Sequence, residues 1–239
     1  GFSGQVASDS VGDSFIKDLK AGGVSFAGKQ AENGPATARS MILVTPDTIR
    51  SMNTFLGSSL YLNSSHLPEH TTAKIIYLEG YLFDAPEGPA IFDRAAEIAY
   101  KSGAKLSLSL SDAWCVERHF EAFTEFVKNH VCILFSNEDE IGSLGKTNVN
   151  SSAALVSSWV DELIVTKGAA GATIFAEERQ VSVPAMPYGE VVDTTGAGDL
   201  FASGYLFGRV TGASVPQSAE LASKCAGEII CHFGARPKL

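Results

Sequence analysis

The sequence lacks the marks of a secreted, membrane-spanning or nucleic-acid-binding protein. No apolar stretch approaches the length of a membrane span, and residues 1–5 carry neither the basic nor the apolar region of a signal peptide. Asp and Glu outnumber Lys and Arg by 27 to 18, and this acidic balance disfavours nucleic-acid and membrane partners. These absences together predict a cytoplasmic protein.

The sequence has few cysteines, and their spacing does not indicate disulfide pairs. The four cysteines show neither a Cys-x-x-Cys pair nor the spacing of a disulfide framework, so we expect reduced and mostly buried thiols. They are Cys115, Cys132, Cys225 and Cys231.

The composition is that of a globular protein. Of the 239 residues, 45% are hydrophobic, which is enough to bury a substantial core. No internal repeat or low-complexity tract interrupts the chain. We therefore predict one domain over residues 1–239.

Short apolar runs of strand length alternate with longer helical patterns, which is typical of βα units and a mainly parallel sheet. Expected strands lie at residues 74–78, 105–110, 131–135, 162–166 and 173–176. Expected helices lie at residues 89–102, 114–128 and 215–231. The alternation predicts a doubly wound α/β fold.

One segment departs from this alternation. Residues 37–44 and 49–55 read as two strands, joined by a Pro-Asp turn at residues 45–48 that suits a hairpin. Polar and apolar residues alternate through residues 50–55, so one face could cover a ligand while the other meets solvent or a second subunit. We predict an inserted β-hairpin at about residues 36–56; a plain edge of the sheet is the alternative.

A glycine-containing turn followed by an apolar run is the most informative part of the sequence. It reads Asp193-Thr194-Thr195-Gly196-Ala197-Gly198-Asp199, and residues 200–208 continue it as a helical pattern. The two glycines let the backbone approach a ligand, and the start of a helix favours a bound anion. In the first helical turn, Asp199 could accept the proton of an alcohol that attacks a phosphorus atom held over the glycines. The pattern predicts a phosphate-transfer site.

This turn resembles the second signature of the ribokinase-like (PfkB) family of sugar and nucleoside kinases. The resemblance implies a ribokinase-like α/β sheet flanked by helices, with a small β lid. It also implies that the backbone of Gly196, Ala197 and Gly198 stabilises charge on the transferred phosphoryl group, and that Asp199 is the base on the substrate hydroxyl. Thr194 and Thr195 would bind the nucleotide from the same turn. A glycine-rich turn of another α/β protein is the alternative.

Polar residues follow the expected strand at residues 131–135. Asn137 and Glu140 match the family's Asn-x-x-Glu motif, which implies that they help to position Mg²⁺ and phosphate, with Glu140 acting through water. Mg²⁺ prefers oxygen ligands and keeps several waters, which suits a single carboxylate there. Ordinary helix capping by Ser136 or Asn137 is the alternative.

Two further segments resemble the family's nucleotide-binding elements. Thr166, Lys167, Gly168 and Gly171 match its Thr-Lys-Gly-x-x-Gly turn, which lies along the nucleotide; a simple β-turn is the alternative. Residues 223–227 would flank the adenine, which places Ser223 and Gly227 at the base. Ser223 and Lys224 stand near the position where many relatives have Asn, so a specific contact there is in doubt.

The resemblance also covers the hairpin. In the family a β-sheet lid closes over the substrate and sometimes forms a dimer interface, which implies a homodimer through the lid here. The phrases at residues 37–41 and 50–54 resemble those of bacterial members termed adenosine-kinase-like, and they make Arg39, Met41 and Asn53 candidate substrate contacts. A monovalent cation near Asp193 and Gly234 is implied by the resemblance alone.

The start of the chain departs from the family's pattern. Relatives carry a strand and a Gly-Gly-rich substrate motif ahead of the phrase that residues 2–13 resemble, and the sequence begins at that phrase. We therefore expect a truncated chain, or a part of a longer gene product, that lacks the usual grip on the sugar hydroxyls.

The predicted function is ATP-dependent transfer of the γ-phosphoryl group to a primary hydroxyl of a sugar or nucleoside, with Mg²⁺ bridging the phosphates. An adenosine-like acceptor is favoured. A sugar kinase for fructose, ribose or a sugar phosphate is the nearer alternative, and a catalytically silent ligand-binding relative is the other.

Overall fold

A computed structural model describes residues 1–238. Its contacts divide the chain into two compact units. The first comprises Gly1–Ile42, Met52–Ala73 and Tyr81–Ala104; the second comprises Leu43–Ser51, Lys74–Gly80 and the chain from Lys105 onward. The single domain expected from the sequence stays a prediction.

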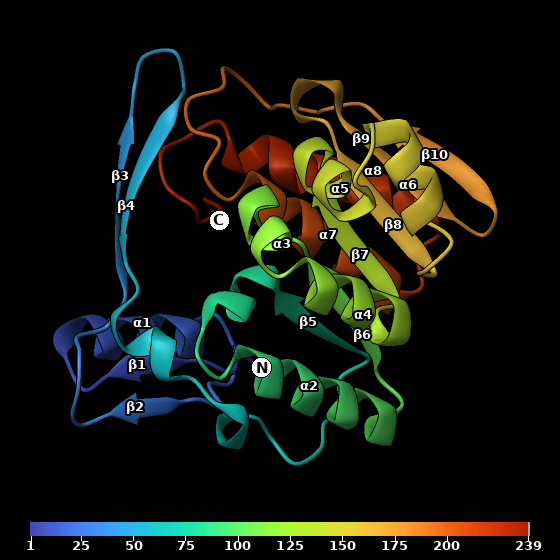
Figure 1. Cartoon of the computed structure of the whole chain (residues 1–239). Coiled ribbons are helices and arrows are strands. Elements are labelled where there is room, and N and C mark those ends of the chain that lie inside the picture. The colour runs from blue at the N-terminus through green and yellow to red at the C-terminus, as the bar shows by residue number, and fades with distance from the viewer. Residues whose placement is uncertain (239) are drawn as a thin grey trace. The chain divides into compact units, whose positions relative to one another are not determined.

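The second unit is built on a six-stranded sheet with the order β10-β9-β8-β7-β6-β5 (Figure 1). Strands β5 to β8 are parallel, and β9 and β10 are antiparallel additions at one edge. The strands are β5 (Ile75–Glu79), β6 (Lys105–Ser109), β7 (Ile133–Asn137), β8 (Glu162–Thr166), β9 (Ala172–Ala176) and β10 (Arg179–Val183). The predicted α/β fold with a mostly parallel sheet is confirmed.

Helices cover both faces of this sheet. Figure 1 shows α5 and α6 in front of the sheet and α7 and α8 behind it. The helices of this unit are α3 (Ala113–Arg118), α4 (Phe120–His130), α5 (Glu138–Gly145), α6 (Val149–Val156), α7 (Ala197–Thr211), α8 (Val215–Ile229) and the short 3-10 helix η4 (Gly168–Ala170). Of the helices that the structure describes, none is both long and apolar enough to cross a membrane.

The strand register sends alternate side chains toward α7 and α8. Ile133 and Phe135 of β7 and Ile164 of β8 pack in one buried cluster with Phe201 and Tyr205 of α7. Because side chains on a strand alternate between faces, Asn137 and Thr166 continue the same row at the carboxyl ends of β7 and β8. This is the end of an open α/β sheet at which ligands bind.

A buried ionic network holds the far end of α7 to the sheet. The Glu162 carboxylate on β8 accepts a hydrogen bond from the Tyr205 hydroxyl at 2.6 Å and a paired contact from the Arg209 guanidinium, with Nη2 at 2.8 Å and Nε at 3.0 Å. Arg209 also donates to the carbonyl of Ala213 at 2.8 Å. Glu162 is 4% exposed, so these donors replace the water that it loses on burial.

The first unit contains a small βαβ arrangement. Strand β1 (Gln5–Ala7) pairs in parallel with β2 (Lys29–Ala31), and α1 (Ser10–Ala21) connects them. Asp9 caps α1 by accepting from the Gly12 N–H, and it also accepts from the N–H and hydroxyl of Thr37. These donors lower the pKa of Asp9 to about 2.

The remaining helices of this unit follow in the chain. They are the 3-10 helices η1 (Gly57–Tyr61), η2 (Ser64–His66) and η3 (Gly80–Asp84, whose first residue belongs to the second unit) and the longer α2 (Gly88–Ser102).

The expected hairpin is present. Strands β3 (Arg39–Val44) and β4 (Arg50–Phe55) form a two-stranded sheet, and Thr48 N–H closes the turn on the Thr45 carbonyl at 2.8 Å. The hydroxyls of Ser40 and Thr54 meet across the strands at 2.9 Å. The boundary between the two units crosses this hairpin, with its tip in the second unit. Its role as a lid stays a prediction.

Several expectations about local structure were wrong. The helix expected at residues 114–128 is two helices, because His119 leaves the helical conformation at ψ 29° and ends α3. The thiols are not mostly buried: Cys115 is buried, whereas Cys132, Cys225 and Cys231 are half-buried. The sequence analysis also missed β1, α1, β2, α6 and β10. The three strands are short and α6 has only eight residues, so their periodic patterns are weak.

We predict that Glu162→Ala costs about 3–5 kcal/mol of unfolding free energy, because it leaves the part-buried Arg209 guanidinium without its carboxylate. Urea denaturation measures the loss. The control is Glu220→Ala, which removes an exposed ion pair with Lys224 on α8 and should leave stability nearly unchanged. Equal losses in the two variants would contradict the structural role of the Glu162 network.

Candidate functional site

The turn before α7 is organised by one buried carboxylate. Asp193 is 2% exposed and accepts hydrogen bonds from the Thr195 N–H at 2.9 Å, the Thr195 hydroxyl at 2.6 Å and the Gly234 N–H at 3.1 Å. Burial alone would raise the pKa of Asp193, but the bonds from Thr195 and Gly234, helped by the Arg50 charge, lower it. The ionised carboxylate thus ties the turn to the C-terminal segment.

The turn then leads directly into the helix. Gly196 has a φ of 80°, in the left-handed region that favours glycine, and it is the N-cap of α7. Ala197 N–H bonds back to the Thr194 carbonyl at 3.2 Å. Within residues 1–238 no acceptor is found for the N–H groups of Gly198 and Asp199, which lie in the first turn, where a helix leaves such donors unpaired.

The space over this turn is open. A Cβ built on Gly198 would meet no atom within 4 Å, and both Gly198 and the Asp199 side chain are exposed. Unpaired N–H groups and the positive end of the α7 dipole therefore face solvent beside a carboxylate. The arrangement can hold an anion and accept a proton next to it.

Arg50 joins this turn, and sequence reasoning missed it. Its Nη1 donates to the Thr194 hydroxyl at 2.6 Å from the tip of the β3–β4 hairpin, and both residues belong to the second unit. Arg50 lies on an exposed strand with no sequence signal that pairs it with a position 144 residues away. The structure adds a fixed positive charge to the anion-binding turn.

Asn137 and Glu140 form an interlocked pair at the start of α5. Asn137 is the N-cap and accepts from the Glu140 N–H at 2.8 Å, while the Glu140 carboxylate accepts from the Asn137 N–H at 3.0 Å and from its Nδ2 at 2.6 Å. This is a capping box, the structural alternative considered for these residues. It does not exclude a magnesium role, because each carboxylate oxygen keeps a lone pair for water.

Glu140 sits in an environment that disfavours its charge. It is 6% exposed, and burial raises the pKa of the Glu140 carboxyl to about 7. The Asn137 N–H opposes this rise, whereas the charges of Asp112, Glu79 and Asp139 add to it. A cation near Glu140 would therefore be favoured electrostatically.

The two glycines of the turn after β8 differ in their surroundings. A Cβ on Gly171 would lie 2.0 Å from the Val183 carbonyl oxygen, so this glycine is required by packing against the end of β10. A Cβ on Gly168 would meet no atom within 4 Å. Lys167 N–H closes the turn on the Gly171 carbonyl at 2.7 Å, which leaves Gly168 as the position open to a ligand.

Ser223 and Gly227 on α8 face the segment that follows β10. The Ser223 hydroxyl is 2.5 Å from the Pro184 carbonyl, to which it donates, and Ser223 is 3% exposed. A Cβ on Gly227 would lie 1.8 Å from the Met186 carbonyl oxygen. Both residues pack α8 against the segment that follows β10. Both are buried, so neither presents an exposed group to a nucleotide.

The register brings two of the predicted residues together at one edge of the sheet. Asn137 is the direct neighbour of Thr166, whose hydroxyl donates to the Ser136 carbonyl at 3.2 Å. Glu79 lies at the end of β5; its charge raises the pKa of Glu140, and the Asp199 charge raises the pKa of Glu79. The predicted acceptor residues Arg39, Met41 and Asn53 are exposed on the hairpin and belong to the first unit.

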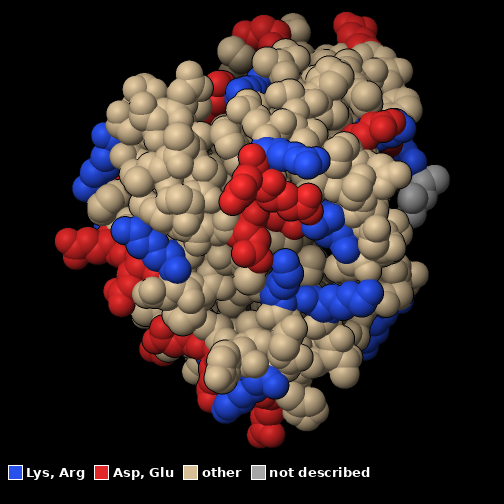
Figure 2. Space-filling view, turned by 90° about the vertical axis from the view of Figure 1, so that its right-hand side faces the viewer, with Lys and Arg blue, Asp and Glu red and all other residues tan. Residues whose placement is uncertain are grey.

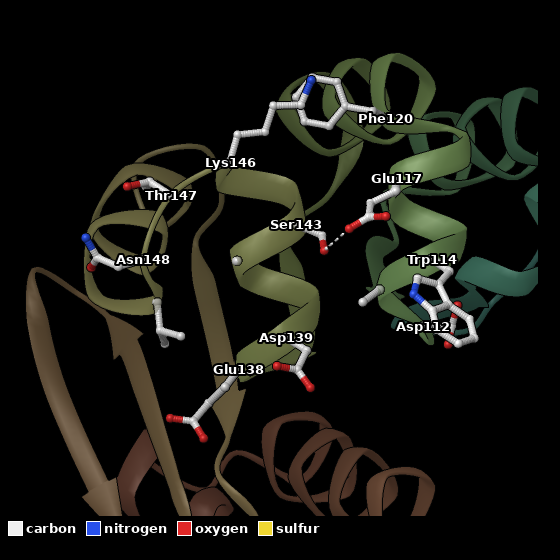
Figure 3. A pocket seen from close by; sticks show the side chains of 13 residues that line it. Asp112, Trp114, Glu117, Phe120, Glu138, Asp139, Ser143, Lys146, Thr147 and Asn148 are labelled. Carbon is white, nitrogen blue, oxygen red and sulfur yellow. Dashed lines mark hydrogen bonds between the residues drawn. The ribbon is translucent and has the colours of Figure 1, made fainter.

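A pocket of about 1080 Å³ lies beside the start of α5 (Figure 3). Figure 3 shows Glu138 and Asp139 of α5 on one side, and Trp114 of α3 with Asp112, the N-cap of that helix, on the other. Ser143 donates to Glu117 across the two helices at 3.2 Å. The pocket adjoins the Asn137–Glu140 pair but contains none of the predicted site residues.

Charged side chains are mixed on the face drawn in Figure 2. Acidic groups gather near its middle with Lys and Arg side chains around them. This face carries no broad area of a single sign.

The comparisons with known proteins agree on one family. A family model described as pfkB family carbohydrate kinase matches residues 1–239. An adenosine kinase from Sinorhizobium meliloti is 37% identical with a TM-score of 0.93, and a protein from Rhizobium etli CFN 42 titled "probable sugar kinase protein" is 38% identical with a TM-score of 0.95. Both alignments cover 99% of this chain and 73% of the solved chain.

A third structure shares the fold alone. It is an Escherichia coli protein solved in complex with ATP and Mg²⁺, 22% identical with a TM-score of 0.85, and the alignment covers 98% of this chain and 77% of that one. Alignments with the first three curated relatives cover only 26%, 36% and 49% of those proteins' lengths.

We predict that stability falls as the pH rises from about 5 to 8 and that Glu140→Gln flattens this dependence. A folded-state pKa raised from 4.5 to about 7 means that the native chain binds more protons than the unfolded chain within this window, so stability is lost as the pH rises through it. The loss is about 3 kcal/mol for one such group. Urea titrations in magnesium-free buffer at both pH values measure it.

Some slope should remain in Glu140→Gln, because burial also raises the pKa of Glu79. If the unfolding free energy of the unmodified chain and that of Glu140→Gln change with pH in parallel, Glu140 is not protonated near neutral pH.

Proposed function

This chain belongs to the pfkB family of carbohydrate kinases, and from that premise we propose that it transfers the γ-phosphoryl group of ATP to a hydroxyl group of a sugar or nucleoside. Family members are phosphotransferases that act on hydroxyl acceptors. The observation that carries the proposal is the open, donor-rich start of α7, with Asp199 in its first turn.

The start of α7 supplies the two functions that phosphoryl transfer needs. The N–H groups of Gly198 and Asp199, with the helix dipole, stabilise negative charge on the transferred group. The Asp199 carboxylate accepts the proton of the attacking hydroxyl. Arg50, held on the Thr194 hydroxyl, adds positive charge at the same turn. Positioning and charge neutralisation then account for most of the rate.

The residues present fit a nucleotide and Mg²⁺. Gly168 and Gly198 leave space that a Cβ would occupy, which suits the approach of phosphates to the backbone. Glu140 would hold Mg²⁺ through water, since its oxygens already accept from Asn137. When bound, Mg²⁺ neutralises phosphate charge. A monovalent cation beside Asp193 and Gly234 stays a prediction.

An adenosine-like acceptor is the finer proposal. The Sinorhizobium meliloti adenosine kinase supports it, whereas the Rhizobium etli sugar kinase, at nearly equal identity, supports a sugar acceptor. We propose that the β3–β4 hairpin closes over the acceptor and that Arg39, Met41 and Asn53 contact it. The exposed apolar residues of this hairpin would also form the interface of a homodimer. They include Met41, Leu43, Ile49, Met52 and Phe55.

We predict that Asp199→Asn lowers turnover at least about a hundredfold while leaving ATP binding intact, since the amide keeps the shape but cannot accept the proton. Coupled measurement of ADP release gives turnover, and calorimetry gives ATP affinity. Asp161→Asn is the matched control, because this exposed carboxylate forms a surface ion pair with Lys105. Turnover near that of the unmodified chain in Asp199→Asn would remove Asp199 from the mechanism.

An acceptor panel with ATP and Mg²⁺ tests the function itself. We expect adenosine to give a higher kcat/KM than ribose, fructose or a sugar phosphate. A higher value for one of the sugars would replace the acceptor class and keep the kinase. ATP binding without phosphorylation of any acceptor would instead support a catalytically silent relative.

A further inference from the structure

A strained three-residue turn connects β6 to α3. Ser111 has a φ of 67°, a conformation that residues with side chains rarely adopt, and the Asp112 N–H bonds to the Leu110 carbonyl at 2.8 Å across it. This is a γ-turn with positive φ, which is rare and persists only where surrounding contacts hold it. Strain of this kind is concentrated at functional positions.

The contacts that hold the turn centre on the Ser111 hydroxyl. Its oxygen accepts a hydrogen bond from the Gly80 N–H at 2.8 Å, and the hydroxyl donates to the Glu79 carboxylate at 2.8 Å. The Ser111 N–H donates to the Ser109 hydroxyl at 3.2 Å. One side chain therefore joins the end of β6 to the end of β5 and engages an oxygen of Glu79.

Glu79 lies on the face of the sheet that α7 covers. It is two residues beyond Tyr77, whose ring packs edge-on against Phe135, and Phe135 packs in the same way against Tyr205 of α7. Alternate residues of a strand share a face, so Glu79 extends this row to the carboxyl edge. The Asp199 charge at the start of α7 is close enough to oppose ionisation of Glu79.

The carboxyl groups of Glu79 and Asp199 have an alternative arrangement that would compete with catalysis. If Glu79 takes up a proton, it becomes a hydrogen-bond donor, and a carboxylate nearby is its strongest acceptor. Such a bond would occupy the oxygen of Asp199 that must receive the substrate proton. Donors directed at Glu79 oppose this state because they stabilise its ionised form.

We propose that Ser111 is a positioning residue: its hydroxyl stabilises the ionised form of Glu79, keeps that carboxylate turned away from Asp199, and so leaves the base free for the acceptor. The inference rests on the proposed kinase function. Burial raises the pKa of Glu79, the Ser111 and Tyr77 hydroxyls lower it, and Asp199 raises it. The Glu79 charge in turn raises the pKa of Glu140 on α5.

The test compares Ser111→Ala and Ser111→Gly in the full chain. Both remove the hydroxyl, but glycine also relieves the backbone strain, so an effect common to both belongs to the hydroxyl. Ser107→Ala is the matched control, because Ser107 lies on β6 with its hydroxyl fully buried and without a partner among the described residues. Its removal should change neither measurement.

The first measurement is the carboxyl titration of Glu79 by carbon NMR, with the signal identified by its loss in Glu79→Gln. Both Ser111 variants should raise the pKa of Glu79. The second measurement is the pH profile of turnover with the best acceptor of the panel. We expect kcat to fall about tenfold, as for one lost hydrogen bond to a charged group, with little change in KM for ATP and a recovery at higher pH.

Unchanged Glu79 titration, or wild-type kcat in Ser111→Gly, would overturn the proposal. A kcat loss in Ser111→Ala that Ser111→Gly restores would also overturn it, because strain and not the hydroxyl would then be the cause. If no acceptor is phosphorylated by the unmodified chain, the kinase function fails; the titration then still decides whether Ser111 holds Glu79 ionised.

Discussion

The buried carboxylate of Asp193 is the contact on which the site depends. Three donors from Thr195 and Gly234 converge on it, so the turn before α7 is held together and tied to the C-terminal segment. Removing water from a carboxylate is costly unless such donors replace it, and here the pKa of Asp193 stays below its usual value. This anchor sets the direction of the first N–H groups of α7. From the anchored turn, the chain enters the helix through the left-handed Gly196, and the Ala197 N–H bonds back to the Thr194 carbonyl.

Helix α7 can carry a charged site because it is fixed at its other end as well. Glu162, Tyr205 and Arg209 tie it to β8, and it packs closely against α8. A Cβ on Gly204 would lie 2.9 Å from the Ala222 Cα, so the two helices approach more closely than larger residues would allow. The helix is held along its length, and an anion at its start would meet donors that need little rearrangement, which is the condition under which fixed dipoles stabilise charge most effectively.

The sequence predicted the parallel strands well because their apolar runs are buried on both faces; the expected strand at residues 162–166 has the observed bounds, Glu162–Thr166. It failed where the local residue pattern carries no signal of the structure. His119 ends a helix that periodicity continues, and Arg50 reaches Thr194 without a local signal. Likewise, Gly168 and Gly171 look equivalent in the sequence, yet the Val183 carbonyl makes only the second a packing requirement. The strain at Ser111 is invisible in sequence because serine ordinarily avoids that conformation.

The capping and metal interpretations of Asn137 and Glu140 are compatible in physical terms. The capping box explains how the pair is held, since every polar group of the Asn137 side chain and both Glu140 oxygens have partners within it. It does not explain why an acid is buried among Asp112, Glu79 and Asp139, where its charge is opposed. A positive charge placed beside Glu140 would reverse that opposition and favour the ionised form. Burial of Glu140 therefore lowers the stability of the cation-free protein at neutral pH, and it also makes the ionisation of this residue sensitive to a nearby cation. The capping bonds meanwhile keep the orientation of the side chain unchanged.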